Sequence, residues 1–346
     1  MHMLARTRSM VGLDIGTSAV KAIELTQKGR EVEVTAFGQV EVASDNLDDR
    51  ARAVRDLMNE GGFQTKRVVT SISGKMVIIR YLNMVRMSDE ELKNAITFEA
   101  EKYVPFPLDE CILDCQRVDG SDEGPSSGNM TVLMVAAKRG QVDEHLRTVE
   151  SAGLVPEVID VDAFALSNAH TLCAGSDEGM DLSGTIAFVD VGSSKTSVNI
   201  IHEGASLFTR EISLGGRDFT DAITKRLMVG FDEAEDLKRD PGDGGDAVKE
   251  AIFPTIDDLG NEIQLSFDYF ENQFDREISR ILLSGGGSRL TFFKDAFERI
   301  FEKPTAVFNP FEHVQVNDGI DADLLASNAP QLVVATGLAA RLAKVG

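Results

Sequence analysis

Two short segments of the chain carry the same set of residues that could bind phosphate. Residues 11–25, VGLDIGTSAVKAIEL, align without a gap with residues 187–201, AFVDVGSSKTSVNII. The matched positions hold an Asp, a Gly and two hydroxyl residues: Asp14, Gly16, Thr17 and Ser18 in the first copy, and Asp190, Gly192, Ser193 and Ser194 in the second. Apolar residues flank each turn, which predicts a β-hairpin. One such turn is common in ordinary hairpins, but two equivalent copies favour two half-domains that clamp one phosphate chain.

Each residue type has a separate task in such a turn. Gly lets an anion approach the backbone, and the N–H groups and hydroxyls that follow it can donate hydrogen bonds to phosphate oxygens. The carboxylates of Asp14 and Asp190 would repel phosphate, so we expect them to hold the water shell of a Mg²⁺ ion. Lys21, in the first copy, can reach the β or γ phosphate as a point charge.

The elements predicted around the first turn form a sheet with helices packed on it. We expect strands over 31–42, 68–73, 75–81 and 155–161, and helices over 48–60 and 162–172.

Residues 86–154 have the pattern of a separate α+β module. Ser88 and Glu91 form a capping-box signature at the start of a helix, which ends at the proline-rich stretch 104–107. The elements expected after it are two strands and a helix, over 111–118, 130–137 and 141–152. This α-β-β-α order predicts a small subdomain inserted into the larger fold.

The second phosphate turn is followed by two more glycine turns. A strand runs into Gly215 and Gly216, and a buried strand runs into the triple glycine Gly285, Gly286 and Gly287, whose backbone a planar or anionic ligand can approach. In this half we expect one helix that begins at 218 and two more that cover 232–238 and 256–274, with a linker at 240–246. A final helix is expected at 333–341. The last helix is rich in small residues, which allows close packing, as at a hinge between domains.

Length and charge limit the possible functions. At 346 residues the chain exceeds the size of most single cores, so two domains are expected. The net charge of −22 argues against binding to nucleic acid or to anionic lipid. The sequence has neither a signal-peptide core nor an apolar run long enough to cross a membrane. We therefore expect a cytoplasmic protein without direct membrane insertion.

The order of these motifs resembles the five-motif signature of the actin, Hsp70 and sugar-kinase superfamily, with its two-domain α/β, ribonuclease H-like ATPase fold. The insertion after the first sheet is similar to that of the FtsA and PilM branch. Residues 11–25, and residues 99–107, EAEKYVPFP, are especially similar to the PilM family of type IV pilus assembly proteins. The resemblance covers nearly the whole chain.

The resemblance implies ATP with Mg²⁺ between the two halves. The family's phosphate-binding residues match the two hydroxyl turns and Lys21, and its Mg²⁺ would lie near Asp14 and Asp190. It places Gly215 and Gly216 beside the nucleoside, Glu235 and Lys238 against ribose and base, and Gly285 to Gly287 against adenosine. For Glu235 and Lys238, a solvated ion pair one helical turn apart is the alternative.

Hydrolysis is expected to be slow or absent. Actin-like ATPases place the group that positions the attacking water at the start of the first small-residue helix, where this chain has Asp162. Asp162 could equally be an ordinary helix N-cap. Lys195 departs from the small or hydroxyl residue expected beside the second turn, and could contact phosphate or point to solvent.

The expected domain order follows from this resemblance. The first half covers 1–85 and 155–180, the insert 86–154, the second half 181–330, and a C-terminal helix at 331–346 returns to the first half.

The resemblance also implies a partner, the N-terminal cytoplasmic tail of the inner-membrane protein PilN, gripped by the insert and the adjoining face of the first half. The protein would then act at the inner face of the inner membrane through its partners, and self-association is left open. The alternatives are an FtsA-like cell-division filament, whose usual C-terminal amphipathic helix this sequence does not show, and a small-molecule kinase of the same superfold.

Overall fold

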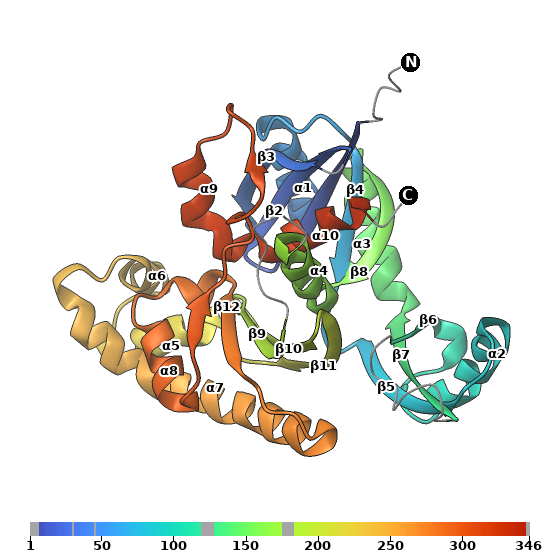
Figure 1. The fold of residues 1–346 in the computed structure, drawn as a ribbon. Helices are drawn as coiled ribbons and strands as arrows, with labels where there is room; N and C mark the ends of the chain where they lie inside the picture. The colour runs from blue at the N-terminus through green and yellow to red at the C-terminus, as the bar shows by residue number, and fades with distance from the viewer. Residues whose placement is uncertain (1–6, 30, 45, 119–127, 175–182, 344–346) are drawn as a thin grey trace.

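The structure is a computed structural model that describes residues 7–29, 31–44, 46–118, 128–174 and 183–343. The sequence favours loops at 120–129 and 175–184, and most of each lies outside the described residues, as does the end of the predicted C-terminal segment. Within the described part of the chain, three sheets and ten α-helices form the fold (Figure 1).

The first half is built on a six-stranded sheet with the order β14-β3-β2-β1-β4-β8. Its strands are β1 (Arg8–Ile15), β2 (Ala19–Lys28), β3 (Glu31–Glu41), β4 (Arg67–Ile72), β8 (Val155–Val161) and β14 (Gln315–Val316). The helices that pack with it are α1 (Leu47–Glu60), α3 (Arg139–Ser151), α4 (Asp162–Ala174), α9 (Ala322–Asn328) and α10 (Val333–Ala339).

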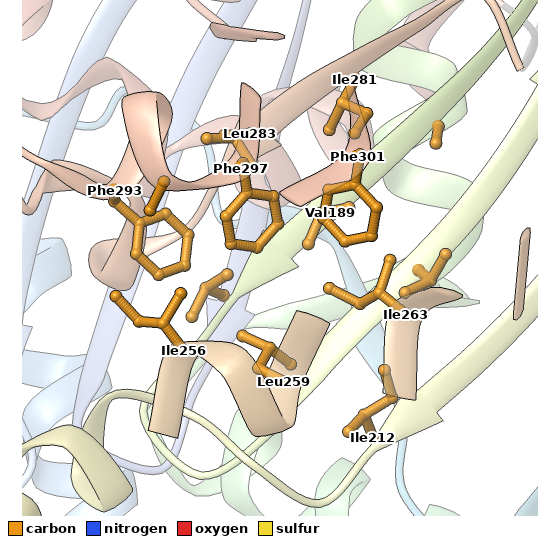
Figure 2. Packing of buried hydrophobic residues seen from close by; sticks show 14 of the residues in the cluster. Val189, Ile212, Ile256, Leu259, Ile263, Ile281, Leu283, Phe293, Phe297 and Phe301 are labelled. Atoms are coloured by element: carbon orange, nitrogen blue, oxygen red, sulfur yellow. The ribbon is translucent and has the colours of Figure 1, made fainter. Parts of the chain in front are cut away.

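The second half is built on a five-stranded sheet with the order β11-β10-β9-β12-β13. Its strands are β9 (Thr185–Val191), β10 (Thr196–His202), β11 (Ala205–Ile212), β12 (Arg280–Ser284) and β13 (Thr305–Val307). Its helices are α5 (Gly216–Leu227), α6 (Phe231–Arg239), α7 (Gly245–Phe274) and α8 (Phe293–Phe301), with a 3-10 helix, η3 (Gly286–Arg289), that begins within the triple glycine. Figure 2 shows the core of this half, where aromatic rings of α8 meet aliphatic side chains of α7, β9 and β12.

The sequence repeat is confirmed as a repeat of strand register. In the first hairpin Asp14 of β1 lies opposite Lys21 of β2, and in the second hairpin Asp190 of β9 lies opposite Ser197 of β10, its equivalent. The phosphate turns therefore stand at the same point of two equivalent hairpins.

A three-stranded sheet with the order β5-β7-β6 forms the core of the inserted part, with α2 (Asp89–Ala100) packed on it. Its strands are β5 (Val77–Val85), β6 (Cys111–Arg117) and β7 (Asn129–Lys138). The predicted capping box of Ser88 and Glu91 is confirmed.

Two elements at the ends of the insert pack differently from the expectation. β5, which the sequence placed in the first half, pairs with β7. Helix α3, expected to close the insert, buries Val149 together with Val54 and Leu57 of α1. Periodicity predicts an amphipathic element but not the surface that it packs on, so the domain boundaries given above stay predictions.

Helix α7 is longer than predicted. The sequence suggested a linker at 240–246 and a helix from 256, but α7 begins at Gly245 and continues through Pro254. Val248 and Ile252 are buried and extend the apolar stripe of the helix toward its start. Tertiary packing of that stripe outweighs the glycine-rich, proline-containing local sequence.

Candidate functional site

The two predicted phosphate turns share one backbone geometry and face each other. The N–H of Gly16 donates to the carbonyl of Ala19 at 3.1 Å, and the N–H of Gly192 donates to the carbonyl of Lys195 at 2.9 Å. Across the two halves, the hydroxyls of the exposed residues Thr17 and Ser194 lie 3.3 Å apart. The turns of both halves therefore place exposed hydroxyl groups next to each other.

The first turn also holds a tight ion pair. Lys21 Nζ donates to Asp14 Oδ2 at 2.8 Å, and both side chains are largely buried. Burial acts to lower the pKa of Lys21, but the carboxylates of Asp14, Asp190 and Asp162 outweigh it and raise that pKa above its ordinary value. Lys21 is therefore a positive charge that is paired with Asp14 and also stabilised by the carboxylates of Asp190 and Asp162.

The carboxyl group of Asp190 is placed differently. Burial raises its pKa to about 6, although a hydrogen bond from Ser284 Oγ to Asp190 Oδ1, at 2.8 Å, and the charge of Lys21 act in the other direction. Ser284 ends β12, which runs parallel to β9 with Ser284 beside Asp190. A carboxylate at this position lacks a full counter-charge, so an added cation would be favourable here.

The Gly215–Gly216 turn packs directly on the second phosphate turn. The N–H of Gly216 donates to the carbonyl of Gly192 at 2.8 Å. A Cβ on Gly215 would lie 2.7 Å from the Gly192 carbonyl oxygen, so only glycine allows this approach. Asp218 accepts the Gly215 N–H at 2.8 Å and fixes the start of α5.

Glu235 and Lys238 of α6 are attached to this glycine turn. Lys238 Nζ donates to Glu235 Oε1 at 2.5 Å, to Thr220 Oγ1 at 2.6 Å and to the Gly216 carbonyl at 3.1 Å. Thr220 Oγ1 also donates to Glu235 Oε1. Glu235 and Lys238 are therefore not a freely solvated ion pair, because both side chains are largely buried and share hydrogen bonds with the turn.

The triple glycine lies on the opposite side of the second turn. Gly285 has φ of 80°, and a Cβ there would lie 2.4 Å from the carbonyl oxygen of Val191. Its N–H donates to the carbonyl of Pro330 at 2.7 Å, which ties this turn to the segment that leads into α10. Two glycine turns, at 215–216 and 285–287, thus contact the second phosphate turn.

Asp162 and Lys195 form an ion pair between the two halves. Lys195 Nζ lies 3.2 Å from Asp162 Oδ2 and 2.8 Å from Glu211 Oε1 of β11, so it is held by two carboxylates and does not extend freely into solvent. Burial alone would raise the pKa of Asp162, but Lys195 and the hydroxyls of Ser73 and Ser71 hold it below its ordinary value. A carboxylate of low pKa that is already paired is a weak general base.

The small-residue helices meet through their backbones. A Cβ on Gly337 of α10 would lie 1.8 Å from the carbonyl oxygen of Ala165 in α4, and a Cβ on Gly12 of β1 would lie 1.9 Å from that of Ala335. These glycines allow α10 to cross β1 and α4 without intervening side chains.

Three residues of the site were not singled out in the sequence. Ser284 and Thr220 complete hydrogen-bond networks, and Glu211 holds Lys195. Ser284 immediately precedes the triple glycine and could have been found there. Glu211 and Thr220 carry no local signal, because only the fold brings them to the turns.

The comparisons with known proteins agree with this arrangement. A family profile for the type IV pilus assembly protein PilM matches residues 12–343. The chain belongs to the PilM family. A solved PilM-PilN type IV pilus biogenesis complex has 28% sequence identity and a TM-score of 0.85, and the match covers 96% of this chain and 98% of that one. The predicted actin-like fold is thereby confirmed.

More distant relatives belong to the same branch. The cell division protein FtsA of Neisseria meningitidis is 25% identical over 89% of this chain and 85% of its own length. FtsA of Bacillus subtilis is 23% identical over 84% of this chain, which spans 66% of the length of that protein. The ethanolamine utilization protein EutJ from Carboxydothermus hydrogenoformans shares the fold, with 16% identity and a TM-score of 0.56.

Within the described residues, no helix has the length and the apolar composition that a membrane-spanning helix needs.

Proposed function

We propose that this PilM-family chain is an actin-like adaptor of type IV pilus assembly that binds ATP with Mg²⁺ between its halves and holds the N-terminal tail of PilN. The observation that carries the nucleotide site is the meeting of two equivalent hydroxyl turns, Thr17 against Ser194, at one point. Backbone N–H groups and hydroxyls at such turns bind phosphate oxygens. The glycine turns at 215–216 and 285–287 pack beside the second of these turns, where the nucleoside would bind.

The residues present fit a magnesium ion held mainly through water. In the described part of the chain, no group of three His, Cys, Asp or Glu side chains could hold a metal by itself. A magnesium–phosphate complex needs few protein carboxylates. Lys21 already neutralises Asp14 at 2.8 Å, whereas Asp190 lacks a full counter-charge. We therefore assign the main metal contact to Asp190, with Asp14 serving chiefly to orient Lys21 toward phosphate.

The experiment is a titration of purified protein with ATP by calorimetry, with and without Mg²⁺. We expect Asp190→Asn to remove most of the magnesium dependence and to weaken ATP binding at least tenfold, as is typical of a lost charge-assisted contact. Asp236→Asn, at an exposed position of α6, makes the same charge change and should leave affinity unchanged. Equal magnesium dependence in the wild type and in Asp190→Asn would contradict the assignment.

The proposed surface for the PilN tail is the insert with the adjoining face of the first half. The support is the match to a PilM-PilN complex over nearly the full chain. The insert also exposes several large apolar side chains that the fold leaves uncovered, which is typical of an interaction surface. They are Val85, Phe98, Tyr103 and Ile112, with Phe98 being 71% exposed.

A labelled peptide with the N-terminal sequence of PilN tests this partner by fluorescence anisotropy, in the presence and absence of ATP. Phe98→Ser should weaken binding about tenfold if the ring is buried by the tail. Met228→Ser, at an exposed apolar residue outside the insert, is the matched control. A peptide that fails to bind in either nucleotide state would remove the PilN assignment while leaving the ATP site intact.

The site favours binding over turnover. Asp162, the candidate for positioning an attacking water, is held by Lys195 and Ser71. We propose that the nucleotide sets the relative position of the two halves that a partner recognises. A filament of the FtsA type stays the alternative, and sedimentation of ATP-loaded protein distinguishes the two.

A further inference from the structure

A long groove follows the free edge of β11 on the side away from β10. It consists of two hollows of about 430 Å³ and about 510 Å³ that meet at Arg210. Residues 207–210 of β11 line the first hollow, and residues 210–214 line the second. Helix α7 forms the opposite wall along both hollows, and β5 of the insert borders the first one (Figure 1).

Two sheet edges that have no further strand among the described residues border this groove. β11 is the last strand of the five-stranded sheet, and β5 is the last strand of the three-stranded sheet. The hydroxyls of Tyr81 in β5 and Ser206 in β11 lie 2.9 Å apart, so the two edges come together at one end. An edge strand presents backbone N–H and C=O groups that can pair with another chain. An edge strand faced by a helix is a known arrangement for binding an extended peptide.

Helix α7 turns a second apolar face toward this groove. Leu265 and Tyr269 lie one helical turn apart, line the first hollow and are each 58% exposed. They do not belong to the buried stripe that packs against the core. The ring of Tyr269 lies 5.7 Å from that of Phe208 in β11. The first hollow therefore has apolar side chains on both walls.

The second hollow is acidic. Glu211 of β11 and Asp258 and Glu262 of α7 line it, and Arg210 is the only basic residue in its lining. Arg210 Nη2 contacts Glu262 Oε2 at 2.6 Å, at the junction of the two hollows. Arg210 pairs with Glu262 and Lys195 pairs with Glu211, so the carboxylate of Asp258 supplies the net negative charge at this end of the groove.

We propose that the groove between β11 and α7 binds an extended segment of a partner protein, which adds to β11 as a further strand. An apolar side chain of the segment lies against Leu265 and Tyr269, and a Lys or Arg side chain lies over Asp258. Because strands rise about 3.3 Å per residue, the two side chains stand about four residues apart in the segment. This inference does not depend on the nucleotide or on PilN.

The probes are fluorescein-labelled ten-residue peptides with alternating threonine and leucine. One form carries two lysines at one end, a second carries two glutamates in their place, and a third is the lysine form with alternate backbone nitrogens methylated. The lysine pair is placed at either end, because the added strand can run in either direction. Binding to the full chain is measured by fluorescence polarisation.

We expect the lysine peptide to bind in one of its two orientations, and the glutamate peptide to bind at least fivefold more weakly. Methylation removes the backbone donors and should weaken binding at least tenfold. Equal binding of the methylated and unmethylated peptides would overturn strand addition. Failure of every peptide to bind at millimolar concentration would overturn the proposal as a whole.

Pairs of variants, one inside the groove and one outside it, test where the peptide binds. Leu265→Ser should weaken the lysine peptide about tenfold, while Leu324→Ser, at an exposed leucine of α9, should not. Asp258→Lys should weaken it about fivefold, while Asp257→Lys, at an exposed neighbour on α7, should not. If Leu265→Ser instead dissolved a dimer seen by analytical ultracentrifugation, the groove would be covered by a second copy of the chain, and the proposal would be wrong.

Discussion

The contact between α10 and α4 should be the part of the fold least tolerant of one added methyl group. Alanine at Gly337 would place its Cβ 1.8 Å from the Ala165 carbonyl oxygen, so the two backbones would have to separate by more than about 1 Å. Such overpacking against backbone costs about 3 kcal/mol, which exceeds the gain of about 1 kcal/mol in helix propensity. We expect Gly337→Ala to be destabilised by about 2 kcal/mol.

Two other helical glycines provide a graded control. At Gly260 of α7 an added Cβ meets the Cγ2 methyl group of Ile300 at 3.1 Å, a contact that a small shift of the side chain relieves, and at Gly140 of α3 it meets nothing within 4 Å. Gly260→Ala should lie within about 0.5 kcal/mol of the wild type, and Gly140→Ala should gain about 0.5 kcal/mol. Urea unfolding followed by circular dichroism measures all three free energies of unfolding. The reasoning fails if Gly337→Ala unfolds at the same urea concentration as Gly140→Ala.

Three further predictions concern the charge and packing of the site and one buried histidine of α4. Lys195→Ser should raise the rate of ATP hydrolysis, measured as phosphate release, because it frees the Asp162 carboxylate. Adding a second substitution, Asp162→Asn, should cancel this increase. Gly285→Ala should weaken ATP binding far more than Gly286→Ala. At Gly285 the added Cβ would lie 2.4 Å from a backbone oxygen, whereas at Gly286 it would lie 3.6 Å from the Gln331 side chain. Similar ATP affinities of the two variants would contradict this prediction. Burial lowers the pKa of His170 to about 4, so the folded protein excludes a proton that the unfolded chain binds, and stability falls as the pH drops below about 6.5. His170→Leu should therefore retain about 1 kcal/mol more of its stability than the wild type between pH 7.5 and pH 5.5, as urea unfolding at both values would reveal.

The parts of the fold that the sequence predicted well are those with local signals. Alternating apolar residues around Asp14 and Asp190 predicted both hairpins, and the capping box at Ser88 predicted the start of α2. The start of α7 was missed because Pro254 and the glycines before it favour a loop locally, whereas burial of Val248 stabilises the helix. The partners of β5 and α3 were also missed, since amphipathic periodicity does not encode which surface an element packs on.

The residues of the candidate site also fall into those that the local sequence predicts and those that only the fold brings together. Glycine and hydroxyl residues could be found from their spacing, because the turn itself requires them. The pairing of Lys195 with Asp162 could not be found, because the two residues come from different halves and only the folded structure brings them together. The same holds for the groove along β11, whose walls are separated in the sequence by more than one helix.

The charge difference between the two halves follows from one pair of equivalent positions. Strand register places Lys21 opposite Asp14, and the equivalent residue opposite Asp190 is Ser197, which carries no charge. The first carboxylate is therefore neutralised within its own hairpin, while the second lacks a full counter-charge and has a raised pKa. A symmetric clamp would need two cations or none. In the clamp that we propose, the ammonium of Lys21 would lie on one side of the phosphate chain, and a magnesium ion that arrives with the nucleotide should contribute most to binding beside Asp190.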